Sequence, residues 1–463
     1  MTSLSCFKAY DIRGKQPEEL NPTLAYHLGA ALATVLPSAK TAMLGMDSRA
    51  TSPQLLAAFA AGLAGQSVAC QSLGLCGTEE VYHAAGSGAC GVGIMVTASH
   101  NPIEYNGFKV AKHGGEPLDL AQEFAAWQQA TLARLAEPAP ESFPAVPTVS
   151  LRAAYVNHLL GLINPANIPA QKIVINAGNG AAGPTADAIL ARLPQLDVVR
   201  VHHEPDGTFP NGIPNPLLVE NRASTANAVK AANASLGVAW DGDFDRCFFY
   251  DGQGNFISSY YIATFMAEAV LARHPGAPIV LDPRLYWATQ AAVEGAGGSA
   301  HFARVGHGFI KPKMRELNSP FAGEISSHFY FREFFTCDSG MLPMLLLLEL
   351  LGKRGQTLAQ AVGELQRTFP AGEELNFRTP TPAKQYLAAL EPQLLAMAPA
   401  HERLDGLSLT HQAAGWRANI RGSSNEPLLR LNVEARSSAT LQQAEHALVA
   451  AILAAGATAE GGH

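Results

Sequence analysis

Residues 92–102 read Val-Gly-Ile-Met-Val-Thr-Ala-Ser-His-Asn-Pro, and this stretch decides the fold class of the chain. The first five residues carry no polar side chain, which predicts a short strand buried on both faces of a sheet. Polar residues and a proline follow at once, so we expect the chain to turn at the carboxyl end of this strand. In parallel α/β sheets the loops at this end carry the chemistry. The stretch therefore predicts an α/β fold with Ser99 presented at a functional edge.

The same pattern of a strand followed by a turn returns along roughly the first 350 residues. Further strands are predicted at five places, namely 42–46, 172–176, 198–202, 236–240 and 278–282. Helical patterns follow most of them, and an early helix begins at Asn21-Pro22, where asparagine caps and proline suits the first turn. This alternation predicts α/β domains with mixed, mainly parallel sheets that helices cover on both faces.

Three stretches predict the domain boundaries. Residues 138–147 hold four prolines, which neither a helix nor a central strand accommodates. Residues 251–254 and 368–370 have the composition of turns. A chain of 463 residues holds roughly three or four domains. We therefore expect three α/β domains and a smaller C-terminal α+β domain, at residues 1–147, 148–253, 254–367 and 368–463.

The composition limits the partners and the location. The net charge is −7 and no segment is strongly basic, so we expect neither nucleic acid nor a membrane as a partner. The six cysteines form no C-x-x-C pair, and the N-terminus lacks the apolar core of a signal peptide. We therefore expect a cytoplasmic protein, monomeric or assembled as a small homo-oligomer.

Ser99 is the first candidate for chemistry. It lies in Thr97-Ala-Ser-His-Asn-Pro102, but a serine reacts only with an activating partner or with a phosphoryl group already attached. The hydrolase motif G-x-S-x-G is absent, and His100 is the direct neighbour of Ser99, which is poor geometry for a catalytic base. The alternative is a capping turn, in which Ser and Asn are common.

The second candidate is Asp241-Gly-Asp-Phe-Asp-Arg246, which directly follows a predicted strand. Three carboxylates at alternate positions can converge on one hard cation, and oxygen ligands favour Mg²⁺ or Ca²⁺ over zinc. An EF-hand is excluded because its sixth and twelfth positions would be Arg246 and Gly252. The alternative, a solvated acidic turn, fits poorly with the apolar residues on both sides.

The third candidate is Gly323-Glu-Ile-Ser-Ser-His328. If this stretch is extended, Glu324, Ser326 and His328 point to one face. A carboxylate, a hydroxyl and an imidazole in a row suit a polyhydroxyl ligand such as a sugar. From these residues alone, the polar face of an edge strand is the better interpretation.

The fourth candidate is Arg421-Gly-Ser-Ser-Asn-Glu-Pro427, which has the composition of a phosphate-binding loop. Ordinary turns share most of this composition. Near the N-terminus, Tyr10, Arg13 and Gly14 place another arginine beside a turn, for which a surface salt bridge is the alternative.

Together and in this order, the four motifs resemble the α-D-phosphohexomutase family, and most of all its bacterial phosphomannomutase/phosphoglucomutase branch. The resemblance covers nearly the whole chain. Ser99 matches the family's phosphoserine in T-A-S-H-N-P, the three aspartates match its Mg²⁺ loop D-G-D-x-D-R, and residues 323–328 match its sugar-recognition loop G-E-x-S-x-H. The implied fold has three related α/β domains and a smaller fourth domain around a central cleft.

One loop departs from the family pattern. Relatives read R-x-S-N-T-E-P or R-x-S-G-T-E-P where this chain reads Arg421-Gly-Ser-Ser-Asn-Glu-Pro427. Ser424 and Asn425 still supply hydrogen-bond donors, so we expect phosphate binding to persist. The sequence leaves open which of these two side chains touches phosphate.

The resemblance implies three sets of site residues. The catalytic set is Ser99, His100, Lys109, Arg13 and Arg246, in which Lys109 matches the family lysine proposed to move a proton. The substrate-binding set is Tyr10, Arg284, His307, Glu324, Ser326, His328, Arg421, Ser423, Ser424 and Asn425. The metal set, for Mg²⁺, is Ser99, Asp241, Asp243 and Asp245.

The implied reaction moves a phosphoryl group reversibly between C1 and C6 of a mannose or glucose phosphate. Phosphorylated Ser99 would form a hexose 1,6-bisphosphate, which turns over and returns its other phosphoryl group. The expected cofactors are therefore Mg²⁺ and catalytic glucose or mannose 1,6-bisphosphate. Glu324 would take the 3- and 4-hydroxyls, which both sugars share, so the loop predicts dual specificity.

Three other functions compete with this interpretation. Phosphoglucosamine mutases belong to the same family but usually read G-E-x-S-G-H and S-G-T-E-P. A Mg²⁺-dependent sugar phosphatase would use the aspartates and leave the Ser99 and Arg421 motifs without roles. A non-catalytic sugar-phosphate binding protein would not need the serine and the aspartates.

Overall fold

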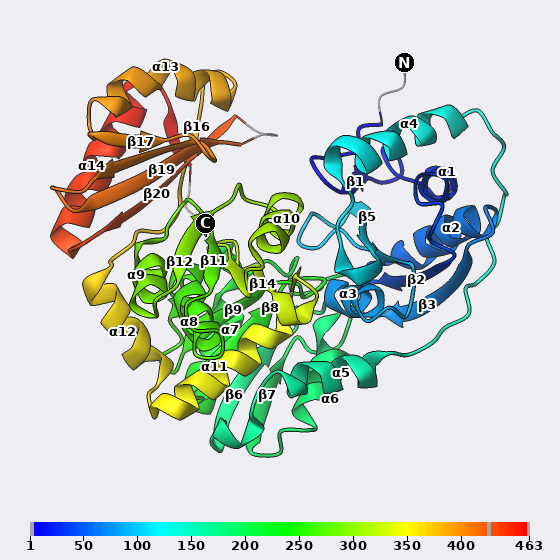
Figure 1. Ribbon diagram of the computed structural model, residues 1–463, viewed down its shortest axis with the longest axis horizontal. Helices are drawn as coiled ribbons and strands as arrows, with labels where there is room; N and C mark the ends of the chain where they lie inside the picture. The colour runs from blue at the N-terminus through cyan, green and yellow to red at the C-terminus, as the bar shows by residue number, and fades with distance from the viewer. Residues whose placement is uncertain (1–3, 424–426, 461–463) are drawn as a thin grey trace.

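The structure, a computed structural model, describes residues 4–423 and 427–460. Each of its four sheets is the centre of one domain (Figure 1). The first sheet has the order β1-β5-β4-β2-β3. Its strands are β1 (Ile12–Lys15), β2 (Thr41–Met46), β3 (Ala69–Leu75), β4 (Val92–Val96) and β5 (Tyr105–Lys112).

The second and third sheets repeat the central strand order of the first, but their antiparallel edge strands come last in the chain, whereas β1 comes first. The second sheet has the order β10-β9-β8-β6-β7, and its strands are β6 (Gln171–Asn176), β7 (Leu196–Val201), β8 (Leu236–Trp240), β9 (Cys247–Asp251) and β10 (Phe256–Ile257). The third sheet has the order β12-β11-β13-β14-β15, and its strands are β11 (Pro278–Leu281), β12 (Ser299–Phe302), β13 (Phe321–Gly323), β14 (Phe329–Phe331) and β15 (Cys337–Asp338).

Each of these three sheets has two parallel pairings on one side and two antiparallel pairings on the other. This shared arrangement confirms the prediction of three related α/β domains with mixed sheets. Parallel and antiparallel pairings are equal in number, because in each domain the last central strand is followed by a hairpin rather than by another crossover helix. We keep 1–147, 148–253, 254–367 and 368–463 as the proposed domain limits. Strand β10, which pairs with β9 of the second sheet, lies just beyond the second of these limits.

Helices fill the crossovers and link the domains. The first domain contains α1 (Pro22–Val35), α2 (Ser52–Ala64), α3 (Thr78–Gly86) and α4 (Ala125–Arg134). The second contains α5 (Arg152–Gly161), α6 (Ala182–Leu190) and α7 (Ala223–Ala232). The third contains α8 (Ser259–Leu271), α9 (Trp287–Gly295), α10 (His307–Leu317), α11 (Met341–Arg354) and α12 (Leu358–Thr368). The predicted cap of α1 is confirmed, since the Asn21 side chain accepts a hydrogen bond from the Leu24 N–H at 2.9 Å.

The fourth domain is built on an antiparallel sheet with the order β17-β18-β19-β20-β16-β21. Its strands are β16 (Leu375–Arg378), β17 (Ala400–Glu402), β18 (Leu407–His411), β19 (Trp416–Gly422), β20 (Leu428–Ala435) and β21 (Thr458–Glu460). Helices α13 (Ala383–Leu395) and α14 (Ser438–Ala454) cover one face (Figure 1). The opposite face is polar along β19 and β20, and it meets the third domain.

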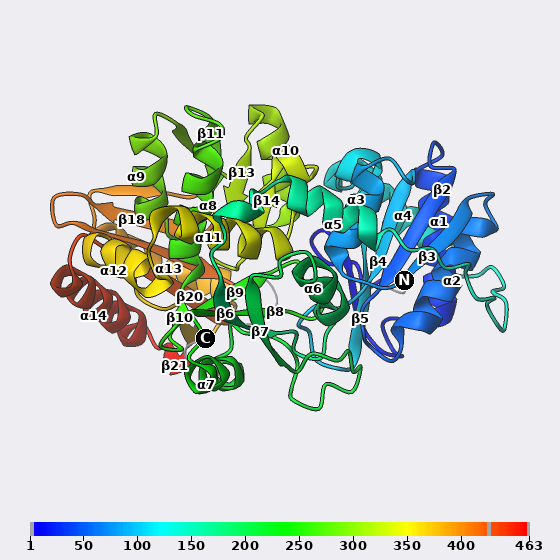
Figure 2. The ribbon, with the colours of Figure 1, turned by 90° about the horizontal axis from the view of Figure 1, so that it is seen from below.

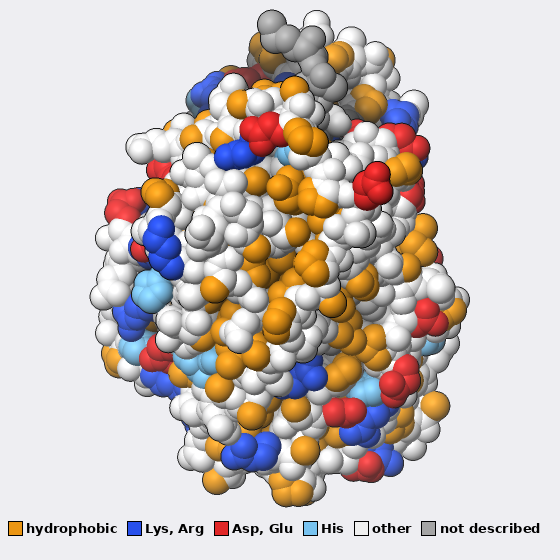
Figure 3. Space-filling model, turned by 90° about the vertical axis from the view of Figure 1, so that its right-hand side faces the viewer, with side chains coloured by type: hydrophobic (Ala, Val, Ile, Leu, Met, Phe, Trp, Pro, Cys, Tyr) orange, Lys and Arg blue, Asp and Glu red, His pale blue; other side chains and the backbone are white. Residues whose placement is uncertain are grey.

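The buried apolar residues show how the domains are joined. One core cluster runs through the second and third domains and includes a few residues of the first, among them Tyr82 and Ala85. The rest of the first domain and the fourth domain have cores of their own. Seen from below, the first domain and helix α14 lie at opposite ends of the molecule (Figure 2). On the face shown in Figure 3, charged side chains of both signs are dispersed around a band of hydrophobic ones. Among the described residues, no helix combines the length and the apolar character needed to cross a membrane.

Candidate functional site

Ser99 lies three residues beyond the end of strand β4 and faces the second domain. Its Oγ donates a hydrogen bond to Asp241 Oδ2 at 2.6 Å and lies 3.1 Å from His100 Nδ1. The residue is buried and has a φ of 50°, a left-handed conformation that is uncommon for any residue but glycine. The surrounding loop must therefore hold Ser99 in place.

Arg49 provides this support, and the sequence analysis did not identify it. Its guanidinium donates to the carbonyl oxygens of Ser99 (3.0 Å), Asn101 (2.6 Å), Pro102 (2.9 Å) and Tyr105 (2.9 Å). An arginine three residues beyond a predicted strand was the only available signal, because its partners are about 50 residues away in the sequence. The buried guanidinium of Arg49 thus holds the loop from Ser99 to Tyr105 at both of its ends.

The three aspartates converge, as their alternate spacing predicts. Asp241, Asp243 and Asp245 are buried, and one carboxylate oxygen from each lies within 4.8 Å of the others. Oδ1 of Asp243 and Oδ1 of Asp245 have no hydrogen-bond partner. Buried carboxylate oxygens are costly when left unpartnered, so this all-oxygen cluster fits a hard cation.

The first domain supports the aspartate loop through the start of α3. Thr78 donates its hydroxyl to Asp243 Oδ2 at 2.6 Å and its backbone N–H to the Asp243 carbonyl at 3.0 Å. A Cβ added to Gly77 would overlap the ring of Phe244, the residue between the two aspartates. Helix N-termini favour negative charge. Gly77 and Thr78 therefore contact the aspartate loop directly, although no local sequence motif predicts this contact.

Basic side chains face the carboxylates from two domains. Lys109 Nζ donates to Asp243 Oδ2 at 2.8 Å and also contacts Asp245, while Arg246 pairs with Asp241 at 2.8 Å. Although burial opposes it, Lys109 holds the pKa of Asp243 below its ordinary value. Burial, and then the charge of Asp243, raises the pKa of Asp245. The cluster is therefore a tightly coupled set of charges.

Arg13 and His100 complete this group. Arg13 pairs with Asp11 at 3.1 Å and donates to the carbonyl of Thr97, next to the serine loop. The alternative of a surface salt bridge is therefore wrong, because the Arg13 side chain is only 11% exposed. Burial, and then the neighbouring Arg246, lowers the pKa of His100 well below its ordinary value, which keeps its imidazole neutral near pH 7.

The residues of the third motif lie together beside the aspartates. Residues 324–328 form a tight turn rather than the extended strand on which the sequence argument rested, with Ser327 at a φ of 70°. The Glu324 carboxylate accepts from Ser326 Oγ at 2.7 Å and lies 3.3 Å from His328 Nδ1. His328 Nε2 is 3.7 Å from Asp245 Oδ1. The turn thus places polar groups at the edge of the acidic cluster.

Tyr10 and His307 lie on the other side of this region. Their rings meet edge to face with 4.5 Å between the centroids. Both line a small pocket between the first domain and the start of α10. Among the described residues, neither ring nitrogen of His307 has a hydrogen-bond partner.

The predicted phosphate loop lies at the end of β19 in the fourth domain. Arg421 Nη2 is 4.0 Å from Glu374 Oε2, and Arg430 on β20 donates to the other oxygen of Glu374 at 3.3 Å. Burial, and then the charge of Arg284, lowers the pKa of Arg421. Arg284 itself is paired with Asp282 in the third domain.

Three residues of the fourth motif need separate mention. Ser423 ends this described segment and donates its backbone N–H to the Leu428 carbonyl at 2.8 Å. Ser424 and Asn425 lie outside the described residues.

Comparison with known proteins decides the family. Models of the four phosphoglucomutase/phosphomannomutase domains match the chain in order. The matches are α/β/α domain I at residues 5–134, domain II at 153–254, domain III at 258–369 and the C-terminal domain at 374–451. A phosphomannomutase of Salmonella typhimurium is 46% identical, and the alignment covers 98% of this chain and all of the relative.

The chain belongs to the phosphoglucomutase/phosphomannomutase family. The curated phosphohexose mutases of Xanthomonas campestris are also 46% identical, over 95% of this chain and 97% of theirs. The crystal structure of a family member from Burkholderia thailandensis superimposes with a TM-score of 0.85 at 29% identity, covering 99% of this chain and 100% of that one. The protein is a hexose phosphate mutase, an isomerase of carbohydrate metabolism.

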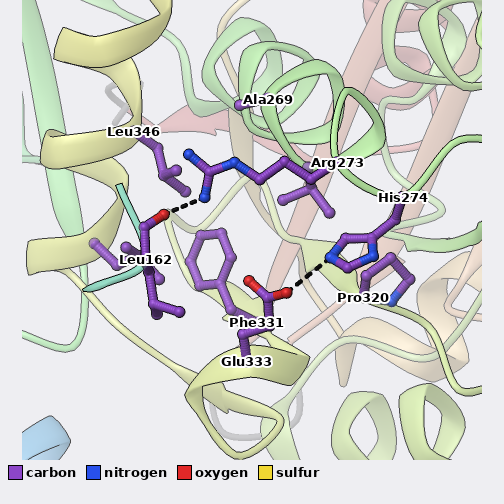
Figure 4. Close-up of a pocket in the computed structure, with 10 residues that line it drawn as sticks. Leu162, Ala269, Arg273, His274, Pro320, Phe331, Glu333 and Leu346 are labelled. Atoms are coloured by element: carbon purple, nitrogen blue, oxygen red, sulfur yellow. Dashed lines mark hydrogen bonds and ion pairs between the residues drawn. The ribbon is translucent and has the colours of Figure 1, made fainter. Parts of the chain in front are cut away.

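Another pocket of the structure lies away from this mutase site (Figure 4). Leu162, Phe331 and Leu346 contribute apolar surface, and Arg273 closes one side by donating to the Leu162 carbonyl. His274 pairs with Glu333 at 2.9 Å on the other side. None of the predicted site residues that the structure describes lines this pocket.

Proposed function

We propose that this mutase carries the transferred phosphoryl group on Ser99 and interconverts the 1- and 6-phosphates of mannose and glucose. The contact between Ser99 Oγ and Asp241 Oδ2, at 2.6 Å across two domains, is the observation that supports it most strongly. A buried serine beside three converging carboxylates suits phosphoryl transfer better than acyl transfer. The curated relatives that are named phosphomannomutases and phosphohexose mutases favour the same substrates.

The reaction has two transfers. A free hydroxyl of the hexose monophosphate attacks phosphorus on phosphorylated Ser99, so the new P–O bond to the sugar forms as the bond to Ser99 Oγ breaks. The product is a hexose 1,6-bisphosphate. The bisphosphate then reorients in the site so that its other phosphoryl group faces Ser99. Ser99 Oγ attacks that group, and the isomeric monophosphate is released. The same bisphosphate can load an unphosphorylated enzyme, which makes it an activator.

Asp241, Asp243, Asp245 and the phosphoryl oxygens on Ser99 are the proposed ligands of Mg²⁺. The donor set contains only oxygen, and its two unpartnered carboxylate oxygens offer coordination sites. When bound, Mg²⁺ would neutralise charge that builds up on the transferred group. Arg246, which pairs with Asp241 and lies 3.4 Å from Ser99 Oγ, supports that group from the protein side.

The attacking hydroxyl must lose a proton and the leaving oxygen must regain one. Lys109 is close to the reacting groups. Although burial opposes it, Asp243 and Asp245 raise its pKa, so in this arrangement it stays positively charged and holds its proton. Burial, and then Arg246, lowers the pKa of His100, so its imidazole is neutral but is a weak base. Arg13 and His307 are the other candidates for moving this proton.

Sugar recognition is assigned to Glu324, Ser326 and His328. The Glu324 carboxylate is 2% exposed and accepts hydrogen bonds from Ser326 Oγ and from the Gly306 N–H. A carboxylate fixed in this way can accept the 3- and 4-hydroxyls, which mannose and glucose share. This supports dual specificity, with Tyr10 as a neighbouring contact.

The non-reacting phosphate is assigned to Arg421, Arg284 and Ser423, with Ser424 or Asn425 as a further donor. Guanidinium groups bind phosphate in charge-assisted, often bidentate geometry. Because this site comes from the third and fourth domains, it is separate from Ser99.

A coupled assay tests the proposal. Wild-type protein with a trace of glucose 1,6-bisphosphate should convert mannose 1-phosphate and glucose 1-phosphate to the 6-phosphates, and Ser99→Ala should not. Release of inorganic phosphate instead would identify a phosphatase, and turnover of glucosamine 1-phosphate alone would identify a phosphoglucosamine mutase. The cytoplasmic location and the number of subunits stay predictions, which cell fractionation and sedimentation would check.

A further inference from the structure

The start of helix α3 is a junction between the first three domains. Its first three residues, Thr78, Glu79 and Glu80, are all buried. Thr78 contacts the aspartate loop of the second domain, residues 241–246. Glu80 accepts hydrogen bonds from α5 and α6 of the same domain. Glu79 is hydrogen-bonded to the third domain, so one helical turn joins all three domains.

Glu79 closes the amino end of helix α11. Its Oε1 accepts the backbone N–H of Gly340 at 3.2 Å and that of Met341 at 3.1 Å, and its Oε2 is hydrogen-bonded to Ser339 Oγ. The first N–H groups of a helix have no partner within the helix. The N-cap residue of α11 is Gly340, which has no side chain. The first domain therefore supplies the acceptor that the start of this helix needs.

Gly340 connects this cap to the aspartate loop. Its carbonyl accepts a hydrogen bond from Trp240 Nε1 at 3.0 Å, and Trp240 is the last residue before the loop. A Cβ added to Gly340 would overlap the Phe244 carbonyl oxygen and would lie 3.0 Å from the backbone of Arg246. The backbone that α3 fixes is therefore packed directly behind the loop that carries the three aspartates and Arg246.

The groups in front of this loop need a fixed position. Arg246 pairs with Asp241 at 2.8 Å, and its Nη2 lies 3.4 Å from Ser99 Oγ. Phosphoryl transfer depends on positioning and on charges that are fixed in advance. A displacement of about 1 Å at such a site can lower the rate on the order of 100-fold. A shift of Gly340 would move Arg246 and Asp241 relative to Ser99.

We propose that Glu79 is a positioning residue of the mutase. It acts through Gly340 rather than on the reacting atoms, because it holds the backbone that keeps Arg246 and the aspartates in register with Ser99. This inference deepens the proposed function and rests on it, since the groups that Glu79 positions are those assigned to phosphoryl transfer. Glu79 would therefore govern kcat and Mg²⁺ affinity, and not the binding of the sugar phosphate.

Steady-state kinetics of Glu79→Met and Glu79→Gln at saturating Mg²⁺ test this role. Methionine fills a similar space but offers only a weak acceptor, so kcat should fall by roughly 10- to 100-fold while KM stays within about threefold. Burial raises the pKa of Glu79 to about 8, so near pH 7 its carboxyl carries a proton and glutamine matches it closely. Glu79→Gln should therefore keep kcat within about threefold of the wild type. A raised KM with an unchanged kcat in Glu79→Met would overturn the proposal.

Calorimetric titration of Mg²⁺ examines the aspartate loop separately from turnover. Residues that support metal ligands are worth about 10- to 100-fold in metal affinity, so Glu79→Met should bind Mg²⁺ about 10-fold more weakly or worse, and Glu79→Gln should bind it as the wild type does. Wild-type kcat and wild-type Mg²⁺ affinity in Glu79→Met would overturn the role of Glu79 alone. A wild-type protein that binds no Mg²⁺ and carries no phosphate on Ser99 would overturn the proposed function itself, and this inference with it.

Glu80→Met is the matched control. Glu80 is the next residue, is also buried and also joins α3 to another domain. Its partners Thr185 and Arg152 make no hydrogen bond to the aspartate loop in the described part of the chain. Glu80→Met should lower the Tm about as much as Glu79→Met and should leave kcat and Mg²⁺ affinity unchanged. An equal loss of kcat in the two variants would show that any weakening of α3 lowers activity, and would overturn the specific role of Glu79.

Gly340→Ala tests the same connection from the other side and remains decisive if Glu79→Met does not fold. It keeps the cap but adds a methyl group that presses on the loop, so kcat should fall while KM holds. An unchanged kcat in Gly340→Ala would show that the loop tolerates displacement of this backbone, and would overturn the proposal. In the double variant with Glu79→Met, the loss of kcat should be smaller than the product of the two single losses. Fully multiplicative losses would show two independent effects and would overturn the route through Gly340.

Discussion

Two charged regions of the molecule differ in how their charges are balanced. The transfer end consists of Ser99, Asp241, Asp243, Asp245, Lys109 and Arg246 from the first two domains. The holding end consists of Arg284, Arg421, Arg430 and Ser423 from the third and fourth. At the transfer end every cation faces a carboxylate and the ionisable side chains are buried. At the holding end two arginines share one carboxylate, and their side chains are 19% and 27% exposed.

This difference suits two tasks within one reaction. Groups that stabilise a transition state work best when they are fixed before the substrate arrives, and the buried network at Ser99 is fixed in this way. Under the proposed function, the holding end would instead accept a phosphate that is attached to C1 in one half-reaction and to C6 in the other. Spare positive charge on longer side chains tolerates both positions. Changes at the transfer end should therefore alter kcat, and changes at the holding end should alter KM.

The largest effect is expected for Ser99→Ala. Without the serine oxygen no phosphoryl group is carried, and kcat should fall by a factor on the order of 10⁴ or more. Ser87→Ala, which removes an exposed serine of the same domain, should leave kcat unchanged. Mutase activity close to the wild-type level in Ser99→Ala would remove the distinction between the two ends.

The second-largest loss of activity is expected when the metal is removed. Chelation with EDTA should abolish activity, and added Mg²⁺ should restore it, because the three aspartates offer only oxygen ligands. Calorimetric titration of Mg²⁺ into wild-type protein and into Asp243→Asn should show binding that is lost or strongly weakened in the variant. Full activity in metal-free protein would contradict the assignment of this cluster.

At the holding end we expect a smaller effect, on KM rather than on kcat. Arg421→Ala should raise KM by roughly 10- to 100-fold, since a charge-assisted hydrogen bond is worth about 1.5–3 kcal/mol. If closure of the fourth domain over the substrate is needed for chemistry, kcat should fall as well. Ser99 should remain phosphorylated to the wild-type level by intact mass. Loss of that phosphate with normal substrate binding would mean that Arg421 belongs to the transfer end.

The smallest effect is expected for Gly77→Ala, which tests how rigid the transfer end is. The added methyl group must displace Phe244 between two metal ligands, and overpacking of this kind costs about 1–3 kcal/mol of unfolding free energy. Affinity for Mg²⁺ should fall while KM is unchanged. Gly161→Ala is the control, because a Cβ there would meet nothing within 4 Å. Equal metal affinity in both variants would show that the loop adapts freely.

The central strands could be predicted because their signals are local. The expected strands at 42–46, 172–176 and 236–240 agree with β2, β6 and β8 to within one residue. The antiparallel hairpin strands β5, β9 and β14 were not predicted. Whether a strand returns beside its neighbour depends on pairing partners elsewhere in the chain, and a run such as Tyr105–Lys112, with polar residues and a glycine, carries little local pattern.

The site residues likewise divide into those that a local sequence motif predicts and those that depend on distant contacts. Ser99 and the aspartates belong to short motifs, so their side chains could be named from the sequence. Arg49 and Thr78 could not, because each acts through contacts with residues 50 or more positions away. A single arginine in an alternating strand such as Leu428–Ala435 has the same local pattern whether it faces solvent or another arginine.

The central claim, that Ser99 alone carries the transferred group, is tested most directly by label transfer. Protein incubated with glucose 1,6-bisphosphate carrying ³²P on both phosphates is digested, and the peptides are mapped. We predict label on the peptide that contains Ser99, in the wild type and in Arg421→Ala when the bisphosphate is saturating, and no label in Ser99→Ala. Label on another residue, or undiminished labelling of Ser99→Ala, would contradict the account.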